Sequence, residues 1–308
     1  MIEKIKKTNF LIFSFILLTF LFSFAYNAQR EAKRNEILLS EPLSSMTSCR
    51  YRIPRLIHQT VKSKLNISKD TQMAIQSWQL KNPQYRHLLY DDQDLEQFVI
   101  NSYPHLLPLF REKLKTQVER TDLWRYLVLH EYGGIYTDSD TICVQPIDEW
   151  PIDNHTELVI GIEANMPNHT EVERFKLVYS IQFMQWTIVA KPKHPLLFNV
   201  FSRIDEYVNN EQNDYDSSKM GVLKRTGPGM FTQVINDYLN KTLNLTSKDV
   251  VNGGTYDHKR LKIVNINGFG AGQPHSHSAS LLSLQNRTDI YAYHLFHGGW
   301  KKSYKIKN

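Results

Sequence analysis

The sequence predicts an α/β fold in which a mixed, partly parallel, Rossmann-like sheet is flanked by helices. Short apolar runs of strand character alternate with helical periodicity over residues 53–142, the pattern of an α/β sheet. Residues 116–132 form the strongest predicted helix, because Leu123, Trp124, Leu127 and Val128 recur at core spacing. Gly133-Gly134 ends that helix, and an apolar strand over 135–142 follows directly.

The remaining elements follow in chain order. Residues 53–60 predict the first strand, and 70–80 predict a helix with Asp70 as its N-cap and Asn82-Pro83 as its stop. Further strands are expected at 86–90, 158–162, 181–190, 263–264 and 290–295, and further helices after Asp91-Asp92 and at 195–209 and 229–241. No second boundary is visible within residues 51–308, so this range is predicted to be one domain.

Composition is that of an ordinary globular protein. Of the 308 residues 41% are hydrophobic and 22% are charged, and the net charge is +6. Lysines near both ends account for much of this charge, and no Lys/Arg run is interleaved with aromatic residues. We therefore expect no nucleic-acid groove.

The N-terminal segment predicts a membrane anchor. Residues 10–26 contain no charged residue and as a helix would span roughly 25 Å, enough for a thin bilayer. A cleaved signal peptide is the alternative, but the run is longer than most signal cores. The predicted parts are a cytoplasmic tail (1–9), a signal-anchor (10–26), a polar stem (27–50) and a luminal domain (51–308), in a single-pass type II arrangement.

Two features agree with a luminal domain. The chain contains six N-glycosylation sequons, which begin at Asn66, Asn154, Asn168, Asn240, Asn244 and Asn286. It contains two cysteines, Cys49 and Cys143, and the sequence leaves open whether they pair.

Asp138-Ser139-Asp140 is the main candidate for chemistry. On the predicted strand the two aspartates project to the same face, near the carboxyl end where open α/β sheets place ligands. Neighbouring carboxylates repel unless a cation lies between them, and hard oxygen ligands suit Mg²⁺ or Mn²⁺. By itself an Asp-x-Asp is more often a solvated turn, so the interpretation depends on the helix, the Gly-Gly stop and the strand before it.

Asp122 and Arg125 lie three residues apart on the predicted helix, on neighbouring positions of one turn. A solvent-exposed ion pair is one interpretation. The other is that they bind a sugar ring, whose hydroxyls need both acceptors and donors.

The segment from Arg120 to Asp140 resembles a DXD-containing sugar-transferase family. This family includes the yeast-type Golgi α-1,6-mannosyltransferases, the inositol-phosphoceramide mannosyltransferases and, more distantly, the large clostridial glucosylating toxins. The resemblance is carried in order by Ile53-Pro54, Ile57-His58-Gln59, Trp78, Asn82-Pro83, Tyr85, Asp122, Arg125, Gly133-Gly134, Tyr136, Asp138, Asp140, Thr226-Gly227-Pro228-Gly229, His294 and Gly298-Gly299-Trp300. The family usually has Gly-Ser-Trp where this chain has Gly298-Gly299-Trp300.

The resemblance implies a GT-A fold and a retaining hexosyltransferase of the Golgi membrane that uses Mn²⁺ or Mg²⁺. Its donor would be GDP-mannose or a UDP-sugar, and its acceptor a glycan or a sphingolipid. Catalytic roles would fall to Asp122, Arg125, Asp138 and Asp140. Metal ligands would be Asp138, Asp140 and His294, with His297 as the alternative to His294. Donor-binding residues would be His58, Gln59, Asp122, Arg125, Tyr136, Asp138 and Trp300.

Two other functions fit the residues. Paired aspartates with Mg²⁺ also serve phosphodiester or pyrophosphate hydrolases. A luminal carbohydrate-binding protein without activity is the second, and the intact set of Asp122, Arg125, Asp138 and Asp140 argues against it. His275 and His277 flank Ser276 in a Gly/Ser/His-rich stretch that completes no metal-ligand spacing, so we predict a loop there. The sequence leaves homo-oligomerisation open.

Overall fold

The computed structural model describes residues 52–210, 215–251, 255–258, 260–273 and 275–297. The chain divides into two units, Met1–Met46 and Thr47–Asn308, and all described residues belong to the second. The predicted tail, anchor and stem, Cys49 and Trp300 lie outside the described residues. Within the described ranges, no helix combines the length and hydropathy needed to cross a bilayer.

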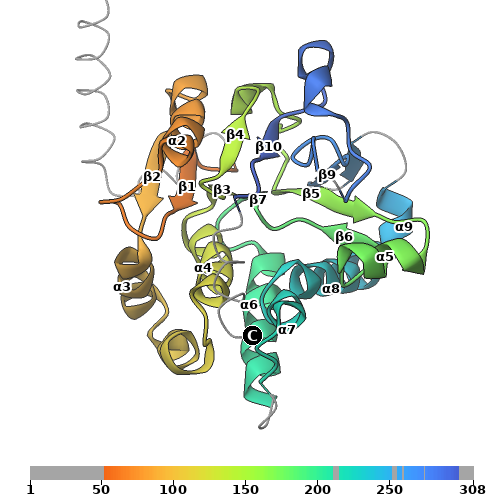
Figure 1. Ribbon diagram of the computed structural model, residues 1–308. Coiled ribbons are helices and arrows are strands. Elements are labelled where there is room, and N and C mark those ends of the chain that lie inside the picture. The colour runs from red at the N-terminus through yellow and green to blue at the C-terminus, as the bar shows by residue number, and fades with distance from the viewer. Residues whose placement is uncertain (1–51, 211–214, 252–254, 259, 274, 298–308) are drawn as a thin grey trace, which may run out of the picture. The chain divides into compact units, whose positions relative to one another are not determined.

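The second unit is built on a mixed sheet with helices on its faces (Figure 1). Its strands are β1 (Leu56–Thr60), β2 (Arg86–Tyr90), β3 (Gly134–Thr137), β5 (Leu158–Asn165), β6 (Ile181–Phe183), β7 (Thr187–Ala190), β8 (Tyr256–His258) and β9 (Leu261–Val264). Their order is β2-β1-β3-β7-β5-β9-β8, and β6 pairs with β5. The pairs β1–β2, β1–β3 and β5–β9 are parallel and the others are antiparallel, so the predicted α/β class and the mixed, partly parallel sheet are confirmed.

A second, two-stranded sheet pairs β4 (Thr141–Cys143) with β10 (Ala292–His294) in antiparallel fashion. It joins a segment that follows the Asp-x-Asp motif to the C-terminal end of the described chain. Because β4 lies directly after that motif, this small sheet brings late residues to the motif.

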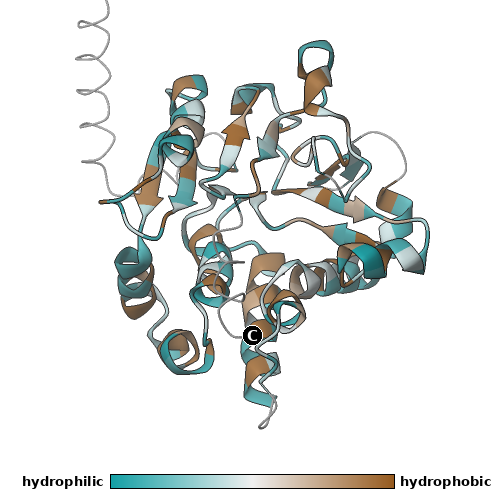
Figure 2. Cartoon of the chain, viewed as in Figure 1, coloured by the Kyte–Doolittle hydropathy of each residue, from teal (hydrophilic) through white to brown (hydrophobic). Residues whose placement is uncertain are grey.

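The helices are α2 (Lys69–Lys81), α3 (Asp92–Ser102), α4 (Gln117–Tyr132), α5 (His169–Phe175), α6 (Pro195–Asn210), α7 (Lys219–Arg225), α8 (Pro228–Tyr238) and α9 (Ser247–Val250). The largest buried core joins α3, α4, α6 and α8 to one face of the sheet, and a second core, which includes Trp78 of α2, covers the other. Figure 2 shows hydrophobic and hydrophilic residues alternating along α6, as expected of a helix with one buried side.

The first five residues of strand β5, Leu158 to Ile162, form a continuous apolar run. Leu158, Ile160 and Ile162 face the larger core, whereas Val159 faces the second one. Helices or loops cover both faces of the sheet here, so apolar side chains are favoured at successive positions from Leu158 to Ile162.

Several predicted ends of helices and strands differ from those in the structure. Ser68, whose hydroxyl accepts from Thr71 N, caps α2 in place of the predicted Asp70. The first strand begins at Leu56 and not at residue 53. The predicted strand over 181–190 is two strands, β6 and β7, separated by Met184, Gln185 and Trp186.

Candidate active site

The Asp-x-Asp motif lies in a turn, so the prediction of one strand over 135–142 is wrong. β3 ends at Thr137, and β4 begins at Thr141 in the other sheet. The amide of Thr141 donates to the carbonyl of Asp138 (3.1 Å) and closes the turn. Strand alternation therefore does not orient the two carboxylates; the turn and its neighbours do.

Several groups fix the carbonyl of Asp138. The hydroxyl of Thr141 donates to it (2.6 Å), and so does the amide of Gln59 (3.2 Å). Gln59 is held in turn by His87, whose Nε2 lies 2.6 Å from its Oε1. The turn is thereby anchored through its backbone, which leaves the carboxylate of Asp138 to other partners.

Three titratable side chains converge at this turn. Nε2 of His294, at the end of β10, lies 3.5 Å from Oδ2 of Asp138 and 3.3 Å from Oδ1 of Asp140. One ligand atom from each residue lies within 4.8 Å of the others, the arrangement of a metal site. Of His297, the backbone N–H donates to Oδ2 of Asp140 (3.1 Å), and its ring is not one of these three groups.

The electrostatics distinguish the two carboxylates. Burial, together with the neighbouring charge of Asp138, raises the pKa of Asp140 above its usual range. Burial would also raise the pKa of Asp138, but Arg125, His294 and the hydroxyl of Tyr136 outweigh it and hold that pKa low. A crowded pair of this kind, with an imidazole beside it, fits a divalent cation such as Mn²⁺ or Mg²⁺.

The His294 ring is not yet arranged as a ligand. Its Nδ1 accepts the backbone N–H of Phe296 (2.7 Å). A neutral ring then carries its proton on Nε2, the atom that faces the carboxylates. The two aspartates fit a cation as they stand, whereas Nε2 of His294 fits one only when the contact with Phe296 is released.

Asp122 and Arg125 form a buried ion pair beside this cluster, not a solvent-exposed one. NH2 of Arg125 also lies 3.4 Å from Oδ1 of Asp138, and its guanidinium packs over the ring of Tyr136 (4.9 Å to the centroid). The hydroxyl of Tyr136 donates to the same Oδ1 (2.8 Å). Arg125 therefore links Asp122 to the Asp-x-Asp turn.

Sequence reasoning missed two further partners of Asp122. The hydroxyl of Thr226 donates to its Oδ2 (2.9 Å), and the amide of Gln185 donates to its Oδ1 (2.9 Å). Burial raises the pKa of Asp122 to about 6, against the lowering effects of Arg125 and the Thr226 hydrogen bond. The Thr-Gly-Pro-Gly signature pointed to Thr226 without a role, whereas nothing in the sequence singled out Gln185.

His58 is fully buried, and both of its ring nitrogens are engaged within the protein. Nδ1 lies 3.1 Å from the hydroxyl of Tyr90, and Nε2 lies 3.0 Å from the carbonyl of Gly133. Burial lowers the pKa of His58 to about 4, so the ring is neutral. Neither nitrogen is left for a ligand in this arrangement.

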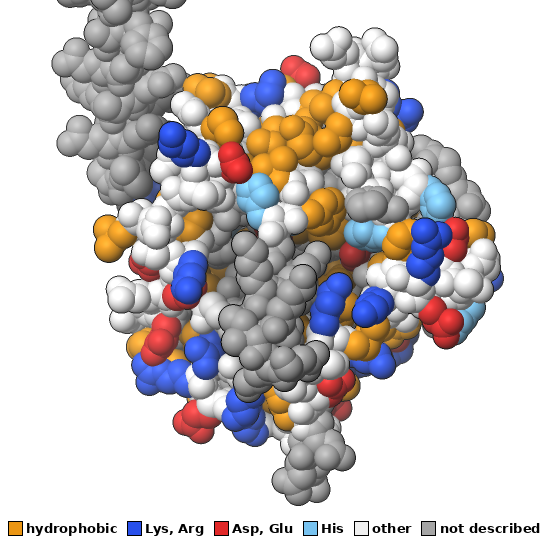
Figure 3. Space-filling view, in the orientation of Figure 1, with side chains coloured by type: hydrophobic (Ala, Val, Ile, Leu, Met, Phe, Trp, Pro, Cys, Tyr) orange, Lys and Arg blue, Asp and Glu red, His pale blue; other side chains and the backbone are white. Residues whose placement is uncertain are grey.

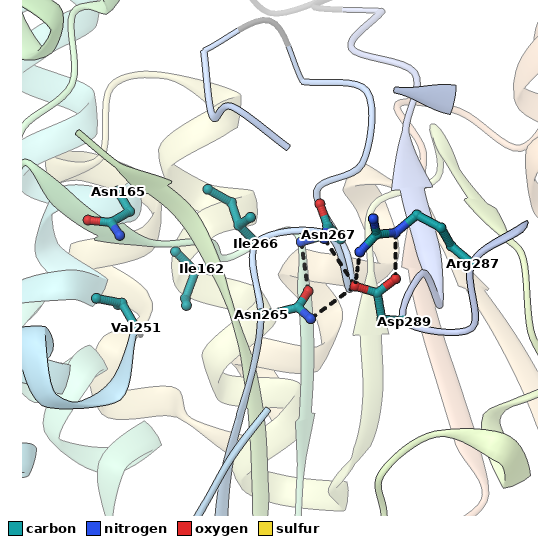
Figure 4. Close-up of a pocket in the computed structure, with 8 residues that line it drawn as sticks. All are labelled: Ile162, Asn165, Val251, Asn265, Ile266, Asn267, Arg287 and Asp289. Atoms are coloured by element: carbon teal, nitrogen blue, oxygen red, sulfur yellow. Dashed lines mark hydrogen bonds and ion pairs between the residues drawn. The ribbon is translucent and has the colours of Figure 1, made fainter. Parts of the chain in front are cut away.

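A cavity of about 320 Å³ lies apart from this cluster. Its lining includes Asn265, Asn267, Arg287 and Asp289, and none of the residues predicted for the site from the sequence. Arg287 and the two asparagines converge on Asp289 (Figure 4). These polar groups satisfy one another, so we place the candidate active site at the Asp138 turn.

Comparisons with known proteins confirm the resemblance inferred from the sequence. Residues 68–157 match the family model described as "Glycosyltransferase sugar-binding region containing DXD motif". The chain is 31% identical over 261 residues to the initiation-specific α-1,6-mannosyltransferase of Schizosaccharomyces pombe, an alignment that covers 81% of this chain and 64% of that protein. It is 38% identical over 96 residues to inositol phosphoceramide mannosyltransferase 2 of the same yeast, covering 31% of this chain and 27% of that one.

Among solved structures, the PaToxG glycosyltransferase matches with 20% identity and a TM-score of 0.45, covering 71% of this chain and 80% of that chain.

Proposed function

We propose, from the match to the DXD sugar-binding family, that this chain is a metal-dependent glycosyltransferase that moves a hexose from a nucleotide-sugar to a glycan or glycolipid acceptor. The observation that carries the proposal is the convergence of Asp138, Asp140 and His294 beside the buried pair of Asp122 and Arg125. Mannose is the favoured sugar and GDP-mannose the favoured donor, because the relatives above are named as mannosyltransferases. UDP-sugars remain part of the test.

Asp138 and Asp140 would hold Mn²⁺ or Mg²⁺, joined by His294 when its Nδ1 is released from Phe296. A bound cation would supply charge neutralisation for the diphosphate leaving group. The protein would add the positive charge of Arg125, held against Asp138 in a buried environment where electrostatic interactions are strong.

Asp122, Arg125 and Tyr136 would bind the donor sugar. A carboxylate offers about four lone-pair positions, and the protein donors named above occupy three of those of Asp122. One remains for a sugar hydroxyl. His58 and Gln59 would act indirectly, since they hold Gly133 and the Asp138 carbonyl, and Trp300 is included from the family resemblance alone.

A GT-A fold and transfer with retention of configuration complete the proposal. The parallel strands β1, β2 and β3 and a ligand site just beyond the end of β3 support the fold assignment. Retention is tested by determining the anomeric configuration of the first-formed product by NMR; an inverted product would contradict it.

We also propose a Golgi luminal domain behind the predicted anchor at 10–26. All six sequon asparagines lie on exposed positions of the described surface, so folded domain and attached glycans are sterically compatible. Full-length protein from secretory membranes should resist carbonate extraction and gain mobility after peptide-N-glycosidase treatment. Protein without glycans, or released by carbonate, would contradict this location.

The activity is tested first by binding and then by transfer. GDP or UDP with Mn²⁺ should raise the Tm of the wild type, because a ligand that binds only the folded state stabilises it in proportion to its affinity. Nucleotide-sugar turnover should depend on an added acceptor, and the variant Asp140→Ala should abolish it. Diphosphate cleavage that ignores the acceptor would favour a hydrolase, and no Tm shift with any nucleotide would favour a binding protein without activity.

A further inference from the structure

Glu163 and His275 form a second acid–imidazole pair. It lies close to the group formed by Asp138, Asp140 and His294, which is called the metal cluster below. Glu163 lies near the end of β5, and His275 lies on the loop that follows β9. The ring of His275 approaches Phe296 edge-on (6.1 Å between centroids), and Phe296 stacks on His294 (4.3 Å). Two ring contacts therefore connect this pair to His294.

Glu163 is held at an irregular point of its strand. The pairing of β5 with β6 shifts between Ile162 and Ala164, so Glu163 lies within a bulge. Bulges redirect side chains and are common beside active sites. Figure 3 shows histidine and acidic side chains beside hydrophobic ones on the face of the molecule that carries β5 and β10.

The carboxylate of Glu163 is buried but incompletely hydrogen-bonded. Its Oε2 accepts from the amide of Gln182 (2.9 Å). Its Oε1 lies 3.6 Å from Nε2 of His275, too far for a hydrogen bond, and accepts no other hydrogen bond within the part of the chain that the structure describes. Oε1 is not among the fully buried atoms that lack a partner, so it keeps contact with solvent, and a ligand hydroxyl can reach it.

The loop that carries His275 also contains an unpaired polar side chain. The amide of Gln273, two residues before His275, is buried, and neither its nitrogen nor its oxygen has a partner among the described residues. Most buried polar side chains are paired. An unpaired amide two residues from His275 favours a polar ligand at this loop.

The spacing of Glu163 and His275 suits a hydroxyl group. A hydroxyl oxygen about 2.8 Å from both atoms would donate to Oε1 of Glu163 and accept from an N–H at Nε2 of His275. We propose that Glu163 and His275 form the acceptor subsite and bind a ring hydroxyl of the sugar or inositol that receives the hexose, with Phe296 as the aromatic wall between this subsite and the metal cluster. This inference rests on the proposed transferase function.

The chain offers a matched control in the same loop. His277 pairs with Glu171 at 3.4 Å, but its side chain is 61% exposed, against 21% for His275. Both pairs join a histidine of this loop to a glutamate. The exposed pair has no ring contact with Phe296 among those found in the described residues.

The test compares His275→Ala and Glu163→Gln with His277→Ala in the full-length protein. Transfer from GDP-mannose is measured with two acceptors, a soluble oligomannoside and inositol phosphoceramide in detergent micelles. The first two variants should raise the acceptor KM about tenfold with at least one acceptor, and the acceptor affected identifies the source of the hydroxyl. The third should match the wild type.

Donor binding is followed separately as the Tm shift caused by GDP with Mn²⁺, which should stay that of the wild type in all three variants. Acceptor KM values that change no more in His275→Ala and Glu163→Gln than in His277→Ala would overturn the subsite while leaving the transferase intact. If Glu163→Gln unfolds, His275→Ala decides. A wild type with neither nucleotide-induced Tm shift nor transfer would refute the proposed function and the subsite with it.

Discussion

Thr226→Val removes the hydrogen bond that Thr226 donates to Asp122 at the centre of the candidate site, together with a longer contact to the carbonyl of Val222 (3.5 Å). The Thr226 hydroxyl donates to Oδ2 of Asp122 at 2.9 Å, and both residues are buried. A hydrogen bond to a charged group contributes about 1.5–3 kcal/mol. For a domain of this size about 2 kcal/mol corresponds to a fall in Tm of roughly 4–8 °C.

The same variant should change the pH dependence of activity. The Thr226 hydrogen bond is one of the effects that lower the pKa of Asp122, which burial raises to about 6. Without the hydroxyl this pKa rises further, toward neutral pH. If ionised Asp122 serves the reaction, the acidic limb of the kcat/KM profile moves to higher pH.

The stability profile has the same sign. Because the pKa of Asp122 is raised in the folded state, the stability that this group contributes is fully present below the ordinary pKa of an aspartate and is lost as the pH rises through about 6. In Thr226→Val that loss should extend to higher pH.

The assays are kcat/KM and Tm across about pH 4–8, an interval that brackets the ordinary and raised pKa of this carboxyl group. Thr226→Ser is the control, since it keeps the hydroxyl. Profiles of Thr226→Val that overlay those of Thr226→Ser would refute the role assigned to this hydrogen bond.

Three further predictions concern the proposed metal ligands Asp138 and Asp140, the glycine at the start of β3, and a buried ion pair. Asp138→Asn and Asp140→Asn should each weaken Mn²⁺ binding more than tenfold in titrations followed by electron paramagnetic resonance, whereas the half-exposed Asp148→Asn should not; equal affinity in all three would exclude the cluster as the site. Gly134→Ala should lower the free energy of unfolding in urea by about 2 kcal/mol or more, because its φ is +95° and an added Cβ would lie 2.6 Å from a backbone oxygen; a stable variant would contradict the strain. Arg225→Met should lower the free energy of unfolding in the same assay by about 3–5 kcal/mol, because it leaves the fully buried Glu119 without its ion-pair partner. A decrease of less than about 1 kcal/mol would contradict this.

Helices and strands with clear apolar periodicity or a clear stop residue were predicted correctly from the sequence. The strand at 86–90 and the helix ending at Tyr132 appear at the predicted residues, because the apolar periodicity and the Gly133 stop are decisive there. The cap of α2 was misassigned because Ser68 and Asp70 are both good caps and only the structure shows which accepts the hydrogen bond.

The site was harder, because its geometry depends on tertiary contacts. Asp138-Ser139-Asp140 has the composition of a turn, but the apolar residues on either side led to the prediction of one continuous strand. In the structure the chain passes at this turn from one sheet into the other. The contact of Gln185 with Asp122 could not be predicted from the sequence, for a related reason. Its amide has a role only because the break between β6 and β7 places it against Asp122.

The pairing register of β4 and β10 determines where His294 lies relative to the two aspartates. Its register pairs His294 with Thr141, the residue immediately after Asp140. A slip of one residue would turn the imidazole to the opposite side of the ribbon. One inserted residue in β10 should therefore disable the cluster while every predicted ligand is still present in the sequence, so an intact motif in a relative does not by itself certify a working site.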